Sequence, residues 1–201
     1  MEGLRRFARR AGIAGAIGGG AMVLGTAAAL AVSVVLPPGG SLSVLATTAA
    51  SEPDLVGVVV HDALVPFTLK SATGVVCAGN LQDRVVRSNR TKQLHFYYRI
   101  RDTKGPGAIK LVATLSFAVP VLRVAYRTDG LGTVPPRQAT RSGGTGGLVT
   151  FTFSDPTISC ARHQESRFVL IKTPATAFTT GGTTRILATN GAGASVPTVQ
   201  P

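Results

Sequence analysis

Basic and aromatic side chains alternate along residues 91–102, TKQLHFYYRIRD. Successive side chains of a β-strand point to opposite faces, so the odd-numbered residues of this stretch share one face. A second predicted strand, residues 121–128, adds Arg123 and Arg127 to an outward face. Guanidinium forks bind anionic groups, and aromatic rings stack on sugars and cations. We therefore predict a ligand-binding face for an anionic envelope polymer or glycan, made of His95, Tyr97, Arg99, Arg101, Arg123 and Arg127. The alternative is a plain solvated face whose charges prevent edge-to-edge aggregation.

Acid–base residues offer a second chemistry, that of an extracytoplasmic hydrolase acting on an envelope polymer. Its candidate residues are scattered along the chain and would have to converge in one concave site. The sequence has no Gly-x-Ser-x-Gly element around a nucleophile. We therefore expect no catalytic residues and a protein that is not an enzyme, with the hydrolase kept as the alternative. Two or three residues of one set would have to converge: His61, His95, His163, Asp62, Asp102 and Glu165.

Cys77 and Cys160 are the only two cysteines. An even pair in an exported chain predicts one disulfide, which on the chain-entropy model would stabilise the fold by up to roughly 4–5 kcal/mol. The alternative is two buried free thiols. No Cys-x-x-Cys or pair of histidines lies near either cysteine, and the Gly-rich stretch 143–147 lacks the Lys-Ser/Thr of a phosphate loop. The sequence therefore predicts neither a metal site nor a cofactor.

The charge of the chain is strongly basic, with 21 Lys and Arg against 9 Asp and Glu and a net charge of +12. From residue 51 onward 17 basic and 8 acidic residues remain, a net +9. Arginine outnumbers lysine 16 to 5, which fits either anion recognition or the codon bias of a GC-rich genome. Nucleic-acid binding is not expected, because it conflicts with export and no known module is present.

The N-terminal region predicts export. Four arginines lie within residues 1–10, and residues 11–36 carry no charge. This pattern is typical of a secretory signal, with cleavage expected near Ala50, and the protein would then be secreted or held in the cell envelope. Alternatively, residues 11–36 form an uncleaved helix that anchors an outward-facing domain in the cytoplasmic membrane.

From Asp54 the sequence changes to short apolar runs separated by Gly, Asn and Pro turn signals. No helical crossover lies between these runs, so an antiparallel β-sandwich of Greek-key or jelly-roll type is predicted, preceded by an N-terminal hydrophobic helix. Residues 1–50 are expected to be the signal or anchor plus a linker, 51–190 the sandwich, and 191–201 a disordered tail. The candidate strands are 55–61, 64–70, 74–88, 91–101, 108–118, 121–128, 147–154, 166–173 and 183–189.

A resemblance to other proteins is carried by four stretches: GNLQDRVVR (79–87), LHFYYRI (94–100), VAYRTDG (124–130), and FVLIKT (168–173) with the following ATAF (175–178). Together they resemble uncharacterised secreted β-sandwich proteins of bacteria, many of which have a PEP-CTERM-type sorting tail. The similarity covers about residues 75–187 and implies fold and export, but no activity. The chain lacks the tail's hydrophobic helix and terminal arginines before Pro201, so the resemblance implies that any anchor is N-terminal.

Overall fold

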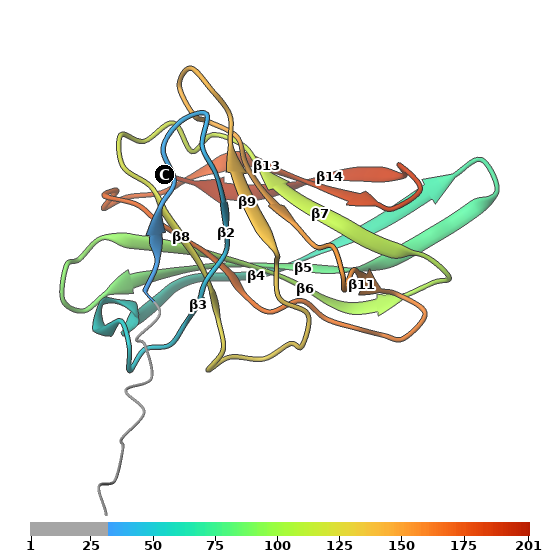
Figure 1. Ribbon diagram of the computed structural model, residues 1–201, viewed down its shortest axis with the longest axis horizontal. Helices are drawn as coiled ribbons and strands as arrows, with labels where there is room; N and C mark the ends of the chain where they lie inside the picture. The colour runs from blue at the N-terminus through green and yellow to red at the C-terminus, as the bar shows by residue number, and fades with distance from the viewer. Residues whose placement is uncertain (1–31) are drawn as a thin grey trace, which may run out of the picture.

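The computed structural model describes residues 32–201, and these form two packed layers of β-strands (Figure 1). The predicted N-terminal hydrophobic helix lies outside the described residues, apart from its last positions, where residues 34–35 form a strand. Within residues 32–201, no helix is long and apolar enough to cross a membrane. The prediction of an all-β fold with two antiparallel sheets is confirmed.

The strands fall into two sheets of seven, here called sheet A and sheet B. Sheet A contains β1 (Val34–Val35), β3 (Ala46–Thr47), β4 (Gly57–Ser71), β5 (Gly74–Ser88), β6 (Leu94–Lys104), β8 (Arg123–Arg127) and β12 (Val169–Lys172). Sheet B contains β2 (Ser41–Ser43), β7 (Ala108–Thr114), β9 (Gln138–Arg141), β10 (Val149–Thr152), β11 (Ile158–Ser159), β13 (Thr179–Ala188) and β14 (Gly193–Gln200). A single 3-10 turn, η1 (Pro53–Leu55), precedes β4.

The strand order places β6 inside sheet A, between β5 and β12, in the sequence β1-β8-β12-β6-β5-β4. Sheet B has the order β14-β13-β7-β10-β9-β2. All of these neighbours are antiparallel, and only β3, which lies beside β8, pairs in parallel. The chain changes sheets seven times between β1 and β14: after β1, β2, β6, β7, β8, β11 and β12. These crossings wrap the two layers around one shared core.

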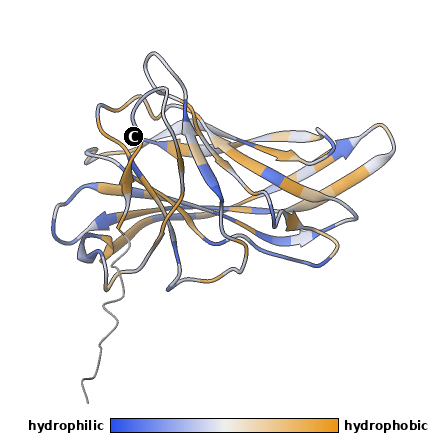
Figure 2. Cartoon of the chain, in the orientation of Figure 1, coloured by the Kyte–Doolittle hydropathy of each residue, from blue (hydrophilic) through white to orange (hydrophobic). Residues whose placement is uncertain are grey.

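The inner side of β6 is the centre of that core, as its period of two predicts. Leu94, Phe96, Tyr98 and Ile100 are each no more than 1% exposed. The Phe96 ring meets the Phe117 ring edge to face, 5.1 Å between centroids. The Tyr98 hydroxyl donates to the carbonyl of Val199 at 3.4 Å. Figure 2 shows the same alternation of hydrophobic and hydrophilic residues along several strands.

Two predicted strands, 55–61 and 64–70, are one continuous strand, β4. A β-bulge between Val59 and His61 leaves Val60 as the extra, unpaired residue, so β4 keeps its pairing with β5 on both sides of an apparent break in alternation. β9 and β11 were not predicted, because short strands leave too few residues to show a period.

The prediction of a disordered tail at residues 191–201 is wrong. Residues 193–200 form β14, which pairs with β13 along its whole length. The prediction relied on the composition of this segment, whose Gly, Ala and Pro residues are typical of a flexible chain end. Pairing and burial decide instead: Val196 and Val199 are 5% and 3% exposed and close one edge of the core.

The sandwich also begins earlier than predicted, within the stretch expected to be leader and linker. β1, β2 and β3 all precede residue 51. Leu36 is fully buried, and its amide donates to the carbonyl of Leu122 at 2.8 Å. Val44 is 7% exposed and belongs to the same core. A chain cut after Ala50 would therefore lack three strands and two core side chains.

The predicted disulfide is present. Cys77 in β5 and Cys160, which follows β11, are bonded with a Cα–Cα distance of 5.8 Å. Because β5 belongs to sheet A and β11 to sheet B, this bond ties the two layers together. A disulfide is typical of proteins in oxidising compartments outside the cytoplasm.

Candidate binding site

The outer face of sheet A, the side turned away from the shared core, is the face on which a ligand site was predicted. The structure shows that the centre of this face is buried from solvent. His95, Tyr97 and Arg99 are 0%, 3% and 4% exposed. The alternation of β6 was interpreted correctly, but both of its faces are covered. The outer side carries a second hydrophobic cluster made of Leu55, Val86, Tyr97, Ala125, Phe168 and Leu170.

A cleft of about 190 Å³ opens beside this cluster. The rings of Tyr97 and Phe168 meet edge to face at 6.2 Å between centroids. The guanidinium carbon of Arg84 lies 5.2 Å from the centre of the Phe168 ring, and that of Arg127 lies 5.8 Å from the Tyr97 ring. Such distances are within the range of cation–π attraction. We call this site the aromatic–arginine cleft; it is lined by Arg84, Val86, Tyr97, Arg127, Asp129, Gly130 and Phe168.

Each arginine at this site has a carboxylate partner. Arg84 donates to Asp62 at 2.7 Å, and Arg127 forms a forked pair with Asp129 at 2.6 and 2.7 Å. The bonds from Arg127 lower the pKa of Asp129. These pairs hold the guanidinium groups in fixed positions and cancel part of their charge.

Two buried guanidinium nitrogens near the Phe168 ring have no hydrogen-bond partner within residues 32–201. The Nε of Arg84 is buried and has no hydrogen-bond partner within residues 32–201. Arg99, whose guanidinium carbon lies 5.6 Å from the Phe168 ring, pairs with Glu165 and also keeps an Nε without a partner there. Buried donors without partners are costly, so they mark places where a further acceptor would be stabilising.

The other predicted binding residues lie away from this cleft. Arg101 is paired with Asp102 at 3.0 Å, towards the far end of β6. Arg123 lines a different and larger cleft of about 530 Å³, which we call the Glu52–Lys172 cleft. The structure therefore brings Tyr97, Arg99 and Arg127 together and separates them from Arg101 and Arg123.

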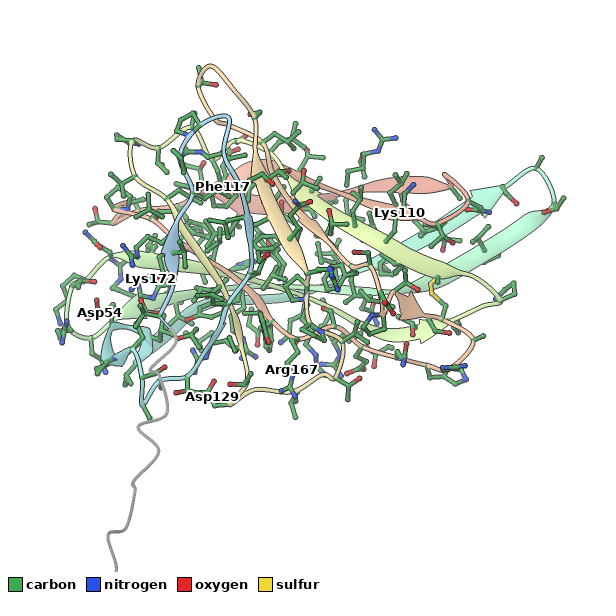
Figure 3. The ribbon with its side chains drawn as sticks, viewed as in Figure 1. Asp54, Lys110, Phe117, Asp129, Arg167 and Lys172 are labelled. Carbon is green, nitrogen blue, oxygen red and sulfur yellow. A yellow bond between two sulfur atoms is a disulfide. The ribbon has the colours of Figure 1, made fainter. Side chains whose placement is uncertain are left out.

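The Glu52–Lys172 cleft is a network of buried charges. Glu52, 8% exposed, accepts the Ser33 amide at 3.0 Å and the Ser33 hydroxyl at 2.7 Å, and it also pairs with Lys172. Burial alone would raise the pKa of Glu52, but the bonds from Lys172 and Ser33 lower it to about 2. Lys172 Nζ lies 3.7 Å from Asp54, and Figure 3 shows these two residues on the same side of the molecule. Glu52 therefore stays charged and connects Ser33, which directly precedes β1, with Lys172 in β12.

His95 lies beneath this network and cannot touch a ligand. It is opposite Lys172 in the register of β6 and β12, and it is fully buried. Neither ring nitrogen has a hydrogen-bond partner within residues 32–201. Burial, followed by the charge of Lys172, lowers its pKa to about 4, so the ring is neutral at pH 7. The prediction that His95 faces the solvent is wrong, because the pattern of one strand does not show what packs over it.

The residues of the hydrolase alternative fall into separate groups. Asp102 and Glu165 meet, the amide of Asp102 donating to Glu165 at 3.0 Å, and His163 contacts the nearby carbonyl of Thr103. His61 lies elsewhere, in a cleft of about 170 Å³ that β13 and β14 also line. Its Nε2 is 3.5 Å from Asp83, a residue that was not predicted to take part.

Asp83 could have been found from the sequence, because it stands between Leu81 and Val85 on the inward side of β5. It is 1% exposed and accepts the amide of Val199 at 2.9 Å. Burial raises its pKa to about 6. Glu52 gave no comparable signal, because it lies in no recognisable motif, and Phe168 was noted only as the first residue of the FVLIKT stretch.

Within residues 32–201, no three His, Cys, Asp or Glu side chains gather in a way that could hold a metal ion. Comparisons with protein-family models, with curated proteins and with solved structures find no match to this chain.

Proposed function

We propose that this protein is an exported, non-enzymatic β-sandwich that binds an anionic polymer of the cell envelope weakly, through the aromatic–arginine cleft. The observation that carries the proposal is the placement of Arg84 and Arg127 beside the rings of Phe168 and Tyr97 in one cleft. Rings provide an apolar wall for a sugar, and guanidinium groups bind its carboxylate or phosphate.

The size of the cleft supports a polymer over a small free ligand. Its volume, about 190 Å³, is below the roughly 300–1,000 Å³ of sites that enclose a drug-sized ligand. One acidic unit or side group would enter, and the rest of the polymer would lie across the outer face of sheet A.

The charge balance supports weak, salt-sensitive binding. Residues 32–201 carry the net +9 noted above, and six of their basic side chains contact carboxylates: Arg84, Arg90, Arg99, Arg101, Arg127 and Lys172. The remaining positive charge attracts polyanions over a distance of about 8 Å at physiological ionic strength. The carboxylates at the cleft limit the affinity, because a polyanion must approach Asp129 as well.

Export is supported by the disulfide together with the basic and apolar N-terminal sequence. A structural or adhesion-like role at the envelope agrees with the same features. The hydrolase alternative retains one specific observation, the contact between His61 and Asp83 in a cleft that also contains Thr198. The Thr198 hydroxyl is itself bonded to Thr184 at 3.1 Å, which favours a structural role for this group.

Binding is tested by the retention of the exported protein on an acidic polysaccharide column as salt is raised. The test variant is Arg84→Gln, and the matched control is Arg185→Gln, an exposed arginine of β13 in sheet B. We expect Arg84→Gln to elute at clearly lower salt, while Arg185→Gln elutes close to the parent. Equal shifts for both variants, or no retention of the parent, would contradict a site at this cleft.

A further inference from the structure

The folded chain starts before the cleavage site that its sequence first suggests. Ser33 is fully buried, and both its amide and its hydroxyl donate to Glu52. Arg123 also donates to the Ser33 hydroxyl, at 3.2 Å, and to its carbonyl. Ser33 is thus held by partners from two other segments, and β1 follows at once. The exported domain must keep this residue to keep these contacts.

The sequence immediately before Ser33 fits a processing site. Ala29-Leu30-Ala31 is an Ala-x-Ala motif, the pattern that signal peptidases cut after. It follows an uncharged run from residue 11 and the four arginines of residues 1–10. Basic region, apolar region and small-residue site therefore stand in the order of a secretory signal.

We propose that the export signal is removed by hydrolysis of the peptide bond between Ala31 and Val32. A signal endopeptidase of the host would add water across this bond, leaving a carboxylate on Ala31 and an amine on Val32 that takes up a proton. The mature protein then begins at Val32 and contains every strand from β1 to β14.

The new N-terminus would lie beside two carboxylates. Val32 lines the Glu52–Lys172 cleft, together with Glu52 and Asp54 and with the cations Arg123 and Lys172. An α-amino group has a pKa near 8, so it carries a positive charge at neutral pH. Ser33, the next residue, already donates its amide to Glu52. The ammonium would therefore join the buried ion-pair network of Glu52, Asp54 and Lys172.

Cleavage near Ala50 would have the opposite result. It would remove β1, β2 and β3 together with Ser33, the residue that gives Glu52 two of its hydrogen bonds. It would also cut a segment that is tied to the fold, since the Ala49 amide donates to Asp129 at 2.7 Å.

The test is expression of the full chain in a secreting bacterial host, followed by N-terminal sequencing and intact-mass measurement of the exported protein. We expect a single N-terminus at Val32 with the disulfide intact. Ala31→Leu should abolish that product, and the matched change Ala50→Leu should leave its N-terminus and yield within twofold of the parent.

An exported protein that begins at Ser51, or that keeps Met1, would overturn the inference, as would processing blocked by Ala50→Leu and not by Ala31→Leu. The inference rests on the export included in the proposed function, but not on binding. Failure to leave the cytoplasm would contradict both, whereas export with another N-terminus would contradict the inference alone.

Discussion

The outer faces of the two sheets differ in ways that their strand patterns do not show. On sheet A the outer face is covered a second time, by a hydrophobic cluster and a network of ion pairs. On sheet B the hydroxyl-bearing residues Ser41, Thr140 and Thr150 are aligned on the outer face by the register of β2, β9 and β10. Figure 3 shows Lys110 of β7 in the sheet B layer, well away from Asp54 and Lys172.

This difference shows where binding chemistry can be built. Side chains on sheet A are held in place by several partners, so guanidinium groups and rings keep a fixed geometry, as a binding site requires. On sheet B, Ser41 is exposed and Thr140 and Thr150 are half-buried, and all three are uncharged, so they offer little electrostatic specificity. The comparison can be tested by changing matched residues on the inner and outer faces.

The disulfide gives the largest expected effect, because it joins the two sheets. Replacing both Cys77 and Cys160 by Ala should lower the free energy of unfolding by up to roughly 4–5 kcal/mol, the chain-entropy figure for a loop of this length. Urea denaturation of parent and variant measures the difference. Equal midpoints would mean that the bond adds nothing to the association of the layers.

The inner face should respond almost as strongly. Phe96→Ala removes a fully buried ring that contacts Phe117, and should cost about 3–5 kcal/mol. Thermal unfolding followed by circular dichroism measures it. A melting temperature equal to that of the parent would contradict the register of β6.

The two outer faces should differ in the same assay. Phe168→Ala, in the covered cluster on sheet A, should cost about 2–3 kcal/mol, less than a central core ring because the cluster is small. Thr150→Ala, on sheet B, should change stability by no more than about 0.5 kcal/mol. Similar costs for both would show that the faces are covered to the same degree.

Two buried carboxylates should give opposite dependences of stability on pH. The pKa of Glu52 is lowered to about 2, so its contribution is complete above its unfolded pKa of 4.5 and is lost as pH falls towards 2. The pKa of Asp83 is raised to about 6, so the folded state holds a proton that the unfolded state releases, and stability is lost as pH rises from 3.8 to 6. Each effect is on the order of 1–3 kcal/mol.

The variants Glu52→Gln and Asp83→Asn separate these two effects. Urea midpoints between pH 2 and 7 should lose their acid-side slope in Glu52→Gln and their decline above pH 4 in Asp83→Asn. Unchanged profiles in both variants would place the pH dependence of stability in other groups.

Much of the fold follows from the sequence, because alternation along β5 and β6 and the turn signals between strands are local properties. Besides the short strands β9 and β11, the strands that were missed are β1 to β3 and β14, which lie in stretches whose composition suggested a leader and a tail. Their pairing depends on distant partners, such as Leu122 for Leu36. Local sequence carries no record of such contacts.

The candidate site was predicted only in part, for the same reason. Tyr97, Arg99 and Arg127 lie together as expected. Arg84 of β5 and Phe168, which directly precedes β12, complete the cleft. His95 was expected in solvent and is buried, because β12 and the Glu52 network pack beside and above it. One strand shows which side chains share a face, whereas burial depends on the rest of the fold.

The most direct test of the proposed site is a titration of the mature, isotope-labelled protein with an acidic oligosaccharide, followed by NMR amide shifts. We predict that the shifts concentrate at Arg84, Asp129, Gly130 and Phe168, while Thr150 and Arg185 stay unchanged, and that they weaken as salt is raised. Shifts that concentrate on β9, β10 and β13, or no shifts at low salt, would contradict a binding site on the outer face of sheet A.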